Sequence, residues 1–145
     1  MIALIQRVNR ARINIDKHMH AEINHGILAF IGIEKTDTEK AADKLLDKIL
    51  AYRVFADSAG RINLNLKDVT GDLMLVSQFT LVADTNSGLR PSFSSAMEPG
   101  LAKEIYHKMV ESAKSKHAVV HSGIFAADMT VELENDGPVT FILSN

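Results

Sequence analysis

The hydrophobic and polar positions of this chain predict a β-rich protein. Over residues 2–15 apolar and polar residues alternate imperfectly, which predicts one long strand with a bend or bulge near residues 9–10. Residues 16–20 are typical of a turn, and a short strand is expected to follow as far as Asn24. A short apolar run at residues 27–33 then predicts a buried strand.

Two later segments carry apolar residues at helical spacing. The first helix is expected to begin at a capping box, in which the Thr36 hydroxyl and the Glu39 carboxylate each satisfy a free N–H, and to end near residues 52–53. The second is expected over residues 99–115, with Pro99 in its first turn. The apolar faces are expected to consist of Ala42, Leu45, Leu46, Ile49 and Leu50 in the first helix, and of Leu101, Ile105, Met109 and Val110 in the second.

The remaining strands are short and separated by turns. Residues 54–66 predict a hairpin around a turn at residues 57–60. Residues 72–83 give the clearest strand pattern, and a polar loop is expected over residues 84–98. Near the end of the chain, strands are expected at residues 119–120, 127–133 and 139–143, with a turn at residues 134–138 that joins the last two.

This order of elements favours an α+β fold with a single domain over residues 1–145. Short strands bounded by glycine favour an antiparallel or mixed β-sheet that curls into a barrel-like core, with the two amphipathic helices outside it. The length of 145 residues, the hydrophobic share of 46% and the charged share of 23% are those of an ordinary globular domain.

Composition excludes several kinds of chemistry. The chain has no cysteine, which excludes disulfides, thiolate metal sites and a cysteine nucleophile, and which fits a reducing cytoplasm. Its first residues reach Arg7 too early for a signal peptide. The longest apolar stretch, at residues 26–33, is too short to span a bilayer, so no membrane partner is expected.

Proteins that bind nucleic acid neutralise its phosphates with lysine and arginine side chains. Because the net charge of this chain is −2, any nucleic-acid partner must bind to a local basic patch. Residues 1–25 and 101–121 each carry four lysine or arginine residues, although either segment is also typical of an ordinary solvated surface. His18 and His20 have a spacing that could form half of a metal site. No third ligand is evident, and exposed turn histidines are the commoner interpretation.

Hydroxyl and amide side chains interrupt the strand pattern at Ser77, Gln78 and Thr80. Polar groups in a buried run cost free energy unless they find partners, so these residues either line a pocket or cap their own backbone at a strand end. In a regular strand, Ser77 and Thr80 point to opposite faces. They face one site only if the strand twists or ends between them.

A glycine–proline pair, Gly137 and Pro138, precedes the last apolar run. A rigid turn here could supply backbone N–H and C=O groups to a pocket. The pair is also typical of a plain hairpin stop, in which glycine tolerates an unusual φ and proline ends the ladder. Most X-Pro bonds are trans, so the residues alone do not predict a cis peptide.

Six collinear segments together resemble the D-aminoacyl-tRNA deacylase (D-tyrosyl-tRNA deacylase) family from end to end. Both site motifs, within residues 77–81 and 135–140, match the family pattern without departure. The six segments are Met1-Ile2-Ala3-Leu4-Ile5-Gln6-Arg7-Val8, Tyr52-Arg53-Val54-Phe55, Ser77-Gln78-Phe79-Thr80-Leu81, Arg90-Pro91-Ser92-Phe93-Ser94, Phe125-Ala126-Ala127-Asp128-Met129 and Asn135-Asp136-Gly137-Pro138-Val139-Thr140.

This resemblance implies an editing enzyme with a barrel-like β fold that works as a homodimer in the cytoplasm. Such an enzyme binds the aminoacylated 3′ end of tRNA and hydrolyses the ester of a D-amino acid. Members of the family also remove glycine mischarged onto alanine tRNA. The resemblance implies no metal and no organic cofactor.

The resemblance also assigns roles to individual residues. Backbone N–H groups at Phe79 and Thr80 would stabilise the oxyanion, while the terminal 2′-hydroxyl of the tRNA helps to orient the attacking water. Ser77 and Gln78 would orient the substrate amine or the terminal adenosine. Met129 would form a wall of the pocket, together with Phe79.

Selection between D- and L-amino acids would lie at Gly137 and Pro138. In the family this peptide is cis and enters the pocket of the partner subunit, where its two carbonyl oxygens crowd the position of an L side chain. Glycine, which lacks a side chain, would pass this screen. Arg7 is expected to brace the inserted turn of the neighbouring subunit.

Other functions and mechanisms stay open from the residues themselves. Thr80 could act as a covalent nucleophile, which requires an adjacent base that the sequence does not show. The chain could instead be a non-catalytic module that binds tRNA 3′ ends, a hydrolase of free esters or amides, or a purely structural dimer.

Overall fold

The computed structural model describes residues 1–86 and 88–144. Within these ranges a six-stranded mixed sheet and a two-stranded hairpin are accompanied by two α-helices and one 3-10 helix. In chain order the elements are β1 (Ile2–Ile15), β2 (His18–Ile23), β3 (Gly26–Gly32), α1 (Glu39–Ala51), β4 (Phe55–Ala56), β5 (Ile62–Leu64), β6 (Asp72–Ser77), η1 (Phe79–Val82), α2 (Pro99–Lys116), β7 (Val120–Ser122) and β8 (Thr130–Ser144).

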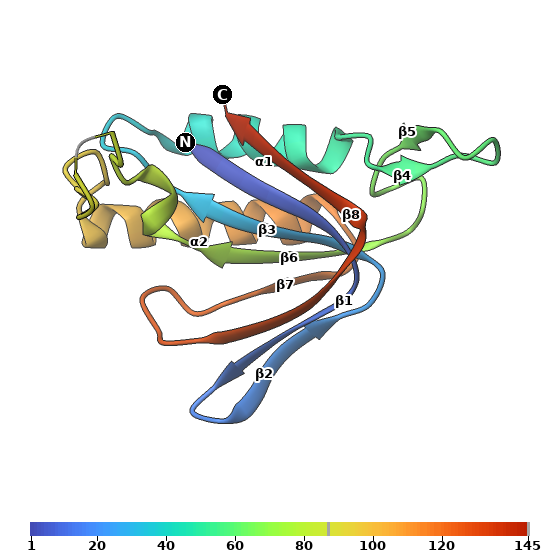
Figure 1. The fold of residues 1–145 in the computed structure, drawn as a ribbon, viewed down its shortest axis with the longest axis horizontal. Helices are drawn as coiled ribbons and strands as arrows, with labels where there is room; N and C mark the ends of the chain where they lie inside the picture. The colour runs from blue at the N-terminus through green and yellow to red at the C-terminus, as the bar shows by residue number, and fades with distance from the viewer. Residues whose placement is uncertain (87, 145) are drawn as a thin grey trace.

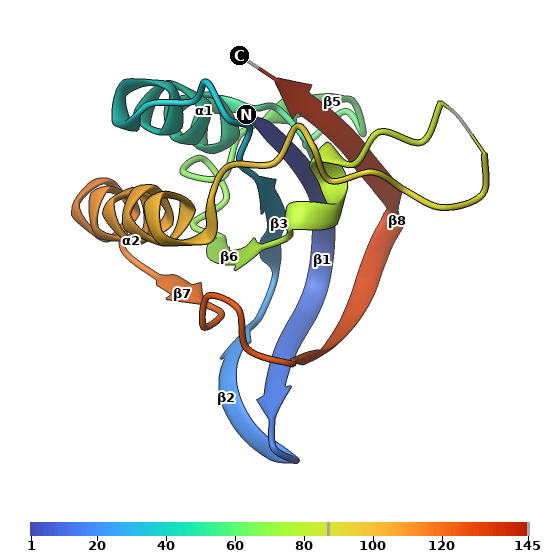
Figure 2. The same ribbon diagram turned by 90° about the vertical axis from the view of Figure 1, so that its left-hand side faces the viewer.

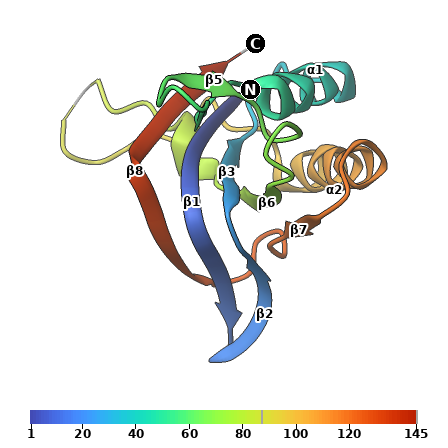
Figure 3. The same ribbon diagram turned by 90° about the vertical axis from the view of Figure 1, so that its right-hand side faces the viewer.

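Strand β1 is the element around which the sheet curls. Its first half, Ile2 to Val8, pairs antiparallel with β3, and its second half, from Ala11 onward, pairs with β2. Strand β8 runs beside β1 along its length, on the other side, as Figure 3 shows. The change of partner falls at residues 9–10, where the bend was predicted. The sheet thus forms a nearly closed, barrel-like layer, which confirms the predicted fold class (Figure 1).

Alternate residues of the central strands face two separate hydrophobic cores. In β3, Ile27, Ala29 and Ile31 face the core that the helices cover, whereas Leu28 and Phe30 face the inside of the curled sheet. Figure 2 shows α1 and α2 stacked on one side of the sheet. Both faces of β3 are therefore buried, because parallel pairing with β6 places it in the middle of the sheet.

Helix α1 buries the five residues that its periodicity predicted, but its cap differs from the prediction. The N-cap is Thr38, whose side-chain oxygen accepts a hydrogen bond of 3.2 Å from the Ala41 N–H. The capping box predicted at Thr36 is wrong. Residues 34–37 form a turn, in which the Asp37 N–H donates to the Glu34 carbonyl. Because Thr36 lies inside this turn, the helix can begin only after Asp37.

Helix α2 buries a face that overlaps the predicted one without matching it. Leu101, predicted to be apolar core, is 56% exposed. The buried face consists of Ala102, Ile105, Tyr106, Met109, Val110 and Ala113. The face is rotated because α2 packs on α1 as well as on the sheet, and ion pairs join Lys108 to Glu39 and Lys116 to Asp43 and Asp47.

Two strand predictions need correction. The strand predicted over residues 72–83 ends at Ser77, because the Gln78 N–H makes a last bond to the Ile31 carbonyl and the chain then winds into η1. The two strands predicted at residues 127–133 and 139–143 are one strand, β8, with an outward bulge at its centre. At that bulge β1 advances by two residues, from Gln6 to Val8, while β8 spans five.

The turn predicted at residues 16–20 is shorter than expected. Only Asp16 and Lys17 form it, with φ of +50° and +66°, and β2 begins at His18. Neither α1 nor α2, the only α-helices in the described ranges, is long and apolar enough to cross a membrane.

Candidate functional site

A pocket of about 620 Å³ opens where β6 ends. Four segments surround it: the end of β3, the end of β6 with the start of η1, the chain that leads into α2, and the connection from β7 to β8. These segments can be followed in Figure 2. Its lining is mostly apolar, and the polar side chains in it are those of Ser77, Gln78 and Glu98. An apolar hollow with a few convergent polar groups is the usual form of a small-ligand site.

The structure brings half of the predicted site residues together in this pocket. The four that line it are Ser77, Gln78, Phe79 and Met129. The four that do not line it are Thr80, Arg7, Gly137 and Pro138. The alternation of side chains along β6 explains the position of Ser77. Leu73 and Leu75 face the core that the helices cover, and Ser77 is the next residue on the same face of the strand.

Two backbone donors at the pocket edge have no acceptor within residues 1–86 and 88–144. They are the N–H groups of Phe79 and Thr80, the first two residues of η1. The preceding N–H, that of Gln78, is already bound to the Ile31 carbonyl at 2.8 Å. The first N–H groups of a helix lack partners inside it, so the end of β6 leaves both donors available for a ligand oxygen.

The Thr80 hydroxyl accepts a hydrogen bond from the side chain of its near neighbour Gln78. Gln78 donates from Nε2 to Thr80 Oγ1 over 2.6 Å. Across the described residues, no histidine or carboxylate hydrogen-bonds to that hydroxyl. Thr80 therefore has a neutral amide as its neighbour and not the base that a nucleophilic hydroxyl requires.

Tyr106 joins β6 to the segment that follows β7, and the sequence did not single it out. Its hydroxyl donates to the Leu75 carbonyl at 2.9 Å and contacts the Gly123 carbonyl at 3.3 Å. Burial raises the pKa of Tyr106 far above its usual value, so the hydroxyl stays protonated and remains a donor. A tyrosine within an otherwise aliphatic helix face was the available signal, since a buried phenol needs a partner.

The Gly137–Pro138 peptide is cis and lies in the bulge of β8, exposed to solvent. Gly137 has φ of +118°, and a Cβ there would lie 2.8 Å from Val139 Cγ2. The side chain of Asn135 closes the turn from inside, because its Oδ1 accepts from the Val139 N–H at 3.1 Å. The turn is thus well held, yet it lies outside the pocket of its own chain.

Arg7 contacts the base of this turn in its own chain. Its Nη1 donates to the Val54 carbonyl at 2.7 Å, and its Nε lies 2.8 Å from Asp136 Oδ2. The Nε–H does not point at the carboxylate, so the second contact is an ion pair and not an aligned hydrogen bond. Arg7 thereby joins the turn of β8 to the start of β4.

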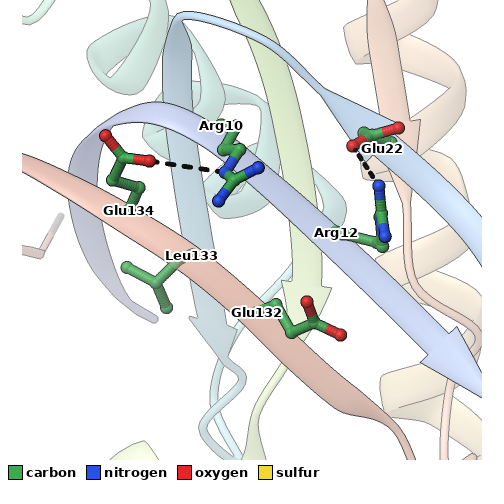
Figure 4. Close-up of a pocket in the computed structure, with 6 residues that line it drawn as sticks. All are labelled: Arg10, Arg12, Glu22, Glu132, Leu133 and Glu134. Carbon is green, nitrogen blue, oxygen red and sulfur yellow. Dashed lines mark hydrogen bonds and ion pairs between the residues drawn. The ribbon is translucent and has the colours of Figure 1, made fainter.

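A second, charged groove of about 270 Å³ lies over β1, β2 and β8 (Figure 4). Its two arginines are neutralised: Arg10 pairs with Glu134 at 3.3 Å and Arg12 with Glu22 at 2.8 Å. The hydrogen bond that Arg12 donates to the Glu22 carboxylate raises the pKa of Arg12 above its usual range. This groove is consequently not the free basic patch that residues 1–25 could have supplied.

Two of the four lysines in the second candidate basic segment are also neutralised. Within residues 101–121, Lys108 and Lys116 are held by carboxylates of α1. The described residues contain no cluster of three histidine or acidic side chains that could hold a metal ion. His20 contacts the Ser122 carbonyl at 3.2 Å, which links β2 to β7.

Comparisons with known proteins agree with this architecture. The profile of the family described as D-Tyr-tRNA(Tyr) deacylase matches residues 4–144. The D-aminoacyl-tRNA deacylase of Cellvibrio japonicus (strain Ueda107) is 57% identical over 143 residues, which are 99% of this chain and 98% of the relative. That of Pseudomonas putida (strain W619) is 52% identical over 143 residues, or 99% of both chains.

Two solved structures share the fold. The c-Myc DNA Unwinding Element Binding Protein superposes with a TM-score of 0.95 at 34% identity, covering 100% of this chain and 99% of that one. A structure described as a probable eukaryotic D-amino acid tRNA deacylase gives a TM-score of 0.89 at 13% identity, covering 99% and 98%. The resemblance drawn from the six sequence segments is confirmed, and the chain belongs to the D-Tyr-tRNA(Tyr) deacylase family.

Proposed function

We propose that this protein is a D-aminoacyl-tRNA deacylase, which hydrolyses the ester that joins a D-amino acid to the 3′ end of tRNA. The observation that carries the proposal is the pair of unpaired backbone N–H groups, at Phe79 and Thr80, beside an apolar pocket in a chain of this family. An activated ester needs little more than correct placement and a charge-stabilising site for its carbonyl oxygen.

In the proposed reaction the ester carbonyl oxygen faces the N–H groups of Phe79 and Thr80. Water attacks the carbonyl carbon, negative charge collects on the oxygen, and the two donors stabilise it. The bond from carbon to the tRNA 3′-oxygen then breaks, and the proton lost by water passes to that oxygen. The neighbouring 2′-hydroxyl of the tRNA orients the water, because no base hydrogen-bonds to Thr80 among the described residues.

Three pocket residues would hold the substrate. The Ser77 hydroxyl makes no hydrogen bond within the described residues, so it is available for the substrate amine or the terminal adenosine. Gln78 donates one of its two side-chain N–H groups to Thr80 and keeps its side-chain oxygen as an acceptor. Met129 supplies an apolar part of the pocket lining.

The proposal places the chiral screen at Gly137 and Pro138 of a second copy of the chain. The turn is exposed, lies outside its own pocket and is braced by Asn135 and Arg7, which suits it to enter a neighbour's pocket. Its carbonyl oxygens would crowd an L side chain at the α-carbon. Glycine would pass, so glycine mischarged onto alanine tRNA is a second proposed substrate. The working form would then be a homodimer, acting in the cytoplasm where tRNA is charged.

The decisive experiment follows release of amino acid from D-tyrosyl-tRNA and L-tyrosyl-tRNA. A deacylase releases D-tyrosine and spares the L-ester. Binding of tRNA without release of amino acid would identify a binding module instead. A parallel assay with D-tyrosine ethyl ester, which lacks RNA, tests the remaining rival, because a general esterase would turn over both D-esters at similar rates.

A further inference from the structure

We infer that Phe79 and Phe93 form a platform on which the penultimate nucleotide of the tRNA 3′ end stacks. The inference rests on the proposed function and adds a nucleotide subsite to it. An unpaired RNA end is usually recognised by stacking of its bases on aromatic rings, because every base has a π-face.

The two phenyl rings are large, exposed and adjacent. Phe79 is 60% and Phe93 is 40% exposed, and both belong to the pocket lining. Their ring centroids lie 4.9 Å apart with the planes inclined by 58°. By contrast, Phe55 and Tyr106 are buried in the core beneath the helices. Exposed aromatic rings beside a pocket offer apolar surface to a ligand.

The segment that carries Phe93 is held in place by backbone contacts. Asp84 and Ser92 exchange two hydrogen bonds, of 2.8 and 3.0 Å. Ser95 donates from its hydroxyl to the Val82 carbonyl, and its own carbonyl accepts from the Lys35 N–H at 3.0 Å. The ring therefore stands on a braced segment, as a stacking surface must if it is to bind without a large ordering cost.

Cations free of ion pairs occur around the same pocket. Lys103 follows the pocket residue Ala102, Arg90 precedes Phe93 by three residues, and the Lys35 backbone is bonded to the Phe93 segment. All three residues are exposed, and none of the ion pairs within the described ranges involves them. The phosphates of an RNA strand crossing this rim would meet positive charge there.

The pocket size places the second nucleotide at the rim. A volume of about 620 Å³ is that of a site for one small ligand, which suits an aminoacyl group with its terminal adenosine. The next nucleotide must leave across the edge of the pocket. Phe79 and Phe93 form part of that edge, so the base of this nucleotide is the group that reaches them.

The test compares three substrates of increasing RNA length: D-tyrosyl-adenosine, the D-tyrosyl ester of the trinucleotide CCA, and D-tyrosyl-tRNA. The variants are Phe93→Ala, Phe93→Tyr, which keeps an aromatic ring, and Leu89→Ala as a control in the same exposed segment. Phe79 is left unchanged because its backbone belongs to the proposed oxyanion site.

We expect Phe93→Ala to lower kcat/KM for the trinucleotide ester and the tRNA by about 5- to 150-fold, mainly through KM. The loss with D-tyrosyl-adenosine should be several-fold smaller. Phe93→Tyr should keep most of the wild-type kcat/KM for the trinucleotide ester and the tRNA. Leu89→Ala should match the wild type on all three substrates. Equal losses on all three substrates would mean that Phe93 contacts the amino acid or only shapes the pocket, and would overturn the inference. Full activity of Phe93→Ala toward tRNA would overturn it as well.

Failure of the proposed function gives a different result. If the wild-type protein hydrolyses none of the three esters, the deacylase proposal fails. Binding of the unacylated CCA trinucleotide then tests whether Phe79 and Phe93 stack a base. This binding should be weaker for Phe93→Ala than for the wild type and for Leu89→Ala. Equal binding by all three proteins would overturn the platform.

Discussion

The Nε of Arg7 lies 2.8 Å from Oδ2 of Asp136, the residue before Gly137. The same guanidinium donates to the Val54 carbonyl at 2.7 Å, so a single side chain couples β1, β4 and the turn of β8. The Arg7 side chain is 13% exposed, which makes these contacts more than a surface ion pair.

Arg7→Ala should destabilise the fold by about 1.5–3 kcal/mol, because it removes a charged donor from a backbone carbonyl and leaves Asp136 unpaired. It should also reduce the preference for D- over L-aminoacyl-tRNA, since the turn loses its brace. Urea unfolding measures the first effect and paired deacylation assays the second. Arg10→Ala is the matched control: its ion pair with Glu134 is largely exposed, and it should change stability by less than about 0.5 kcal/mol.

Gly137→Ala should alter the selection between enantiomers. At φ of +118° an added Cβ is strained, and it would lie 2.8 Å from Val139 Cγ2, so the turn must shift. We expect a stability loss of about 1–3 kcal/mol and a reduced ratio of D- to L-tyrosyl-tRNA turnover.

Gly60→Ala isolates the backbone effect in that experiment. Gly60 also has a positive φ, +76°, but nothing lies within 4 Å of its Cβ position. It should lose stability without any change in stereoselectivity. A Gly137→Ala protein that kept the wild-type ratio of D- to L-turnover would show that the turn is not the screen.

Thr80→Ala should keep most of the deacylase activity, within about tenfold of the wild type, because the backbone N–H survives the substitution. The substitution also removes the hydroxyl oxygen that accepts a hydrogen bond from the Gln78 side chain, so a modest rise in KM is expected. Steady-state kinetics with D-tyrosyl-tRNA provide the measurement. A fall in kcat of about 10⁴ or more is the signature of a deleted nucleophile and would restore the covalent mechanism.

Tyr106→Phe should destabilise the protein by about 1–3 kcal/mol, because the Gly123 carbonyl loses its buried donor and the Leu75 carbonyl keeps only its bond from the Gly123 N–H. The variant should also change the response to alkali. Folding raises the pKa of Tyr106 above its ordinary value of 10.0, so its stabilising contribution is complete below pH 10 and is lost as the pH rises further.

Thermal unfolding over a series of pH values above and below pH 10 checks this. The wild type should lose stability on the alkaline side more steeply than Tyr106→Phe, which has no phenol to ionise. Parallel curves for the two proteins would show that Tyr106 does not control this transition.

Local periodicity predicted much of the fold. The bend in β1, the buried face of α1 and the alternation of β6 as far as Ser77 follow from the spacing of apolar residues. These features depend on neighbours in the sequence and on one buried face. From the sequence, Ser77 could either line a pocket or cap its own backbone, and in the structure it lies in the lining of a pocket.

The features that the sequence did not predict depend on distant partners. The predicted strand stops at Ser77 and the chain continues as η1, because the pairing with β3 ends with the bond to the Ile31 carbonyl. No local sequence pattern encodes the end of this pairing. The rotated face of α2 depends on α1, and the neutralised arginines of β1 depend on carboxylates of β2 and β8. Charges that looked available in the sequence are satisfied only once these strands are side by side.

The shared hydroxyl of Tyr106 has a consequence for how the pocket meets its ligand. One phenol oxygen contacts the carbonyls of Leu75 and Gly123, and the pocket residues Ser77 and Phe125 follow these two by two positions each. The packing of α2 therefore helps to fix the backbone from which these pocket residues project before any substrate arrives, and a site prepared in this way binds at a low entropic cost. Substitutions deep in α2 would then shift substrate tolerance without touching a reacting atom.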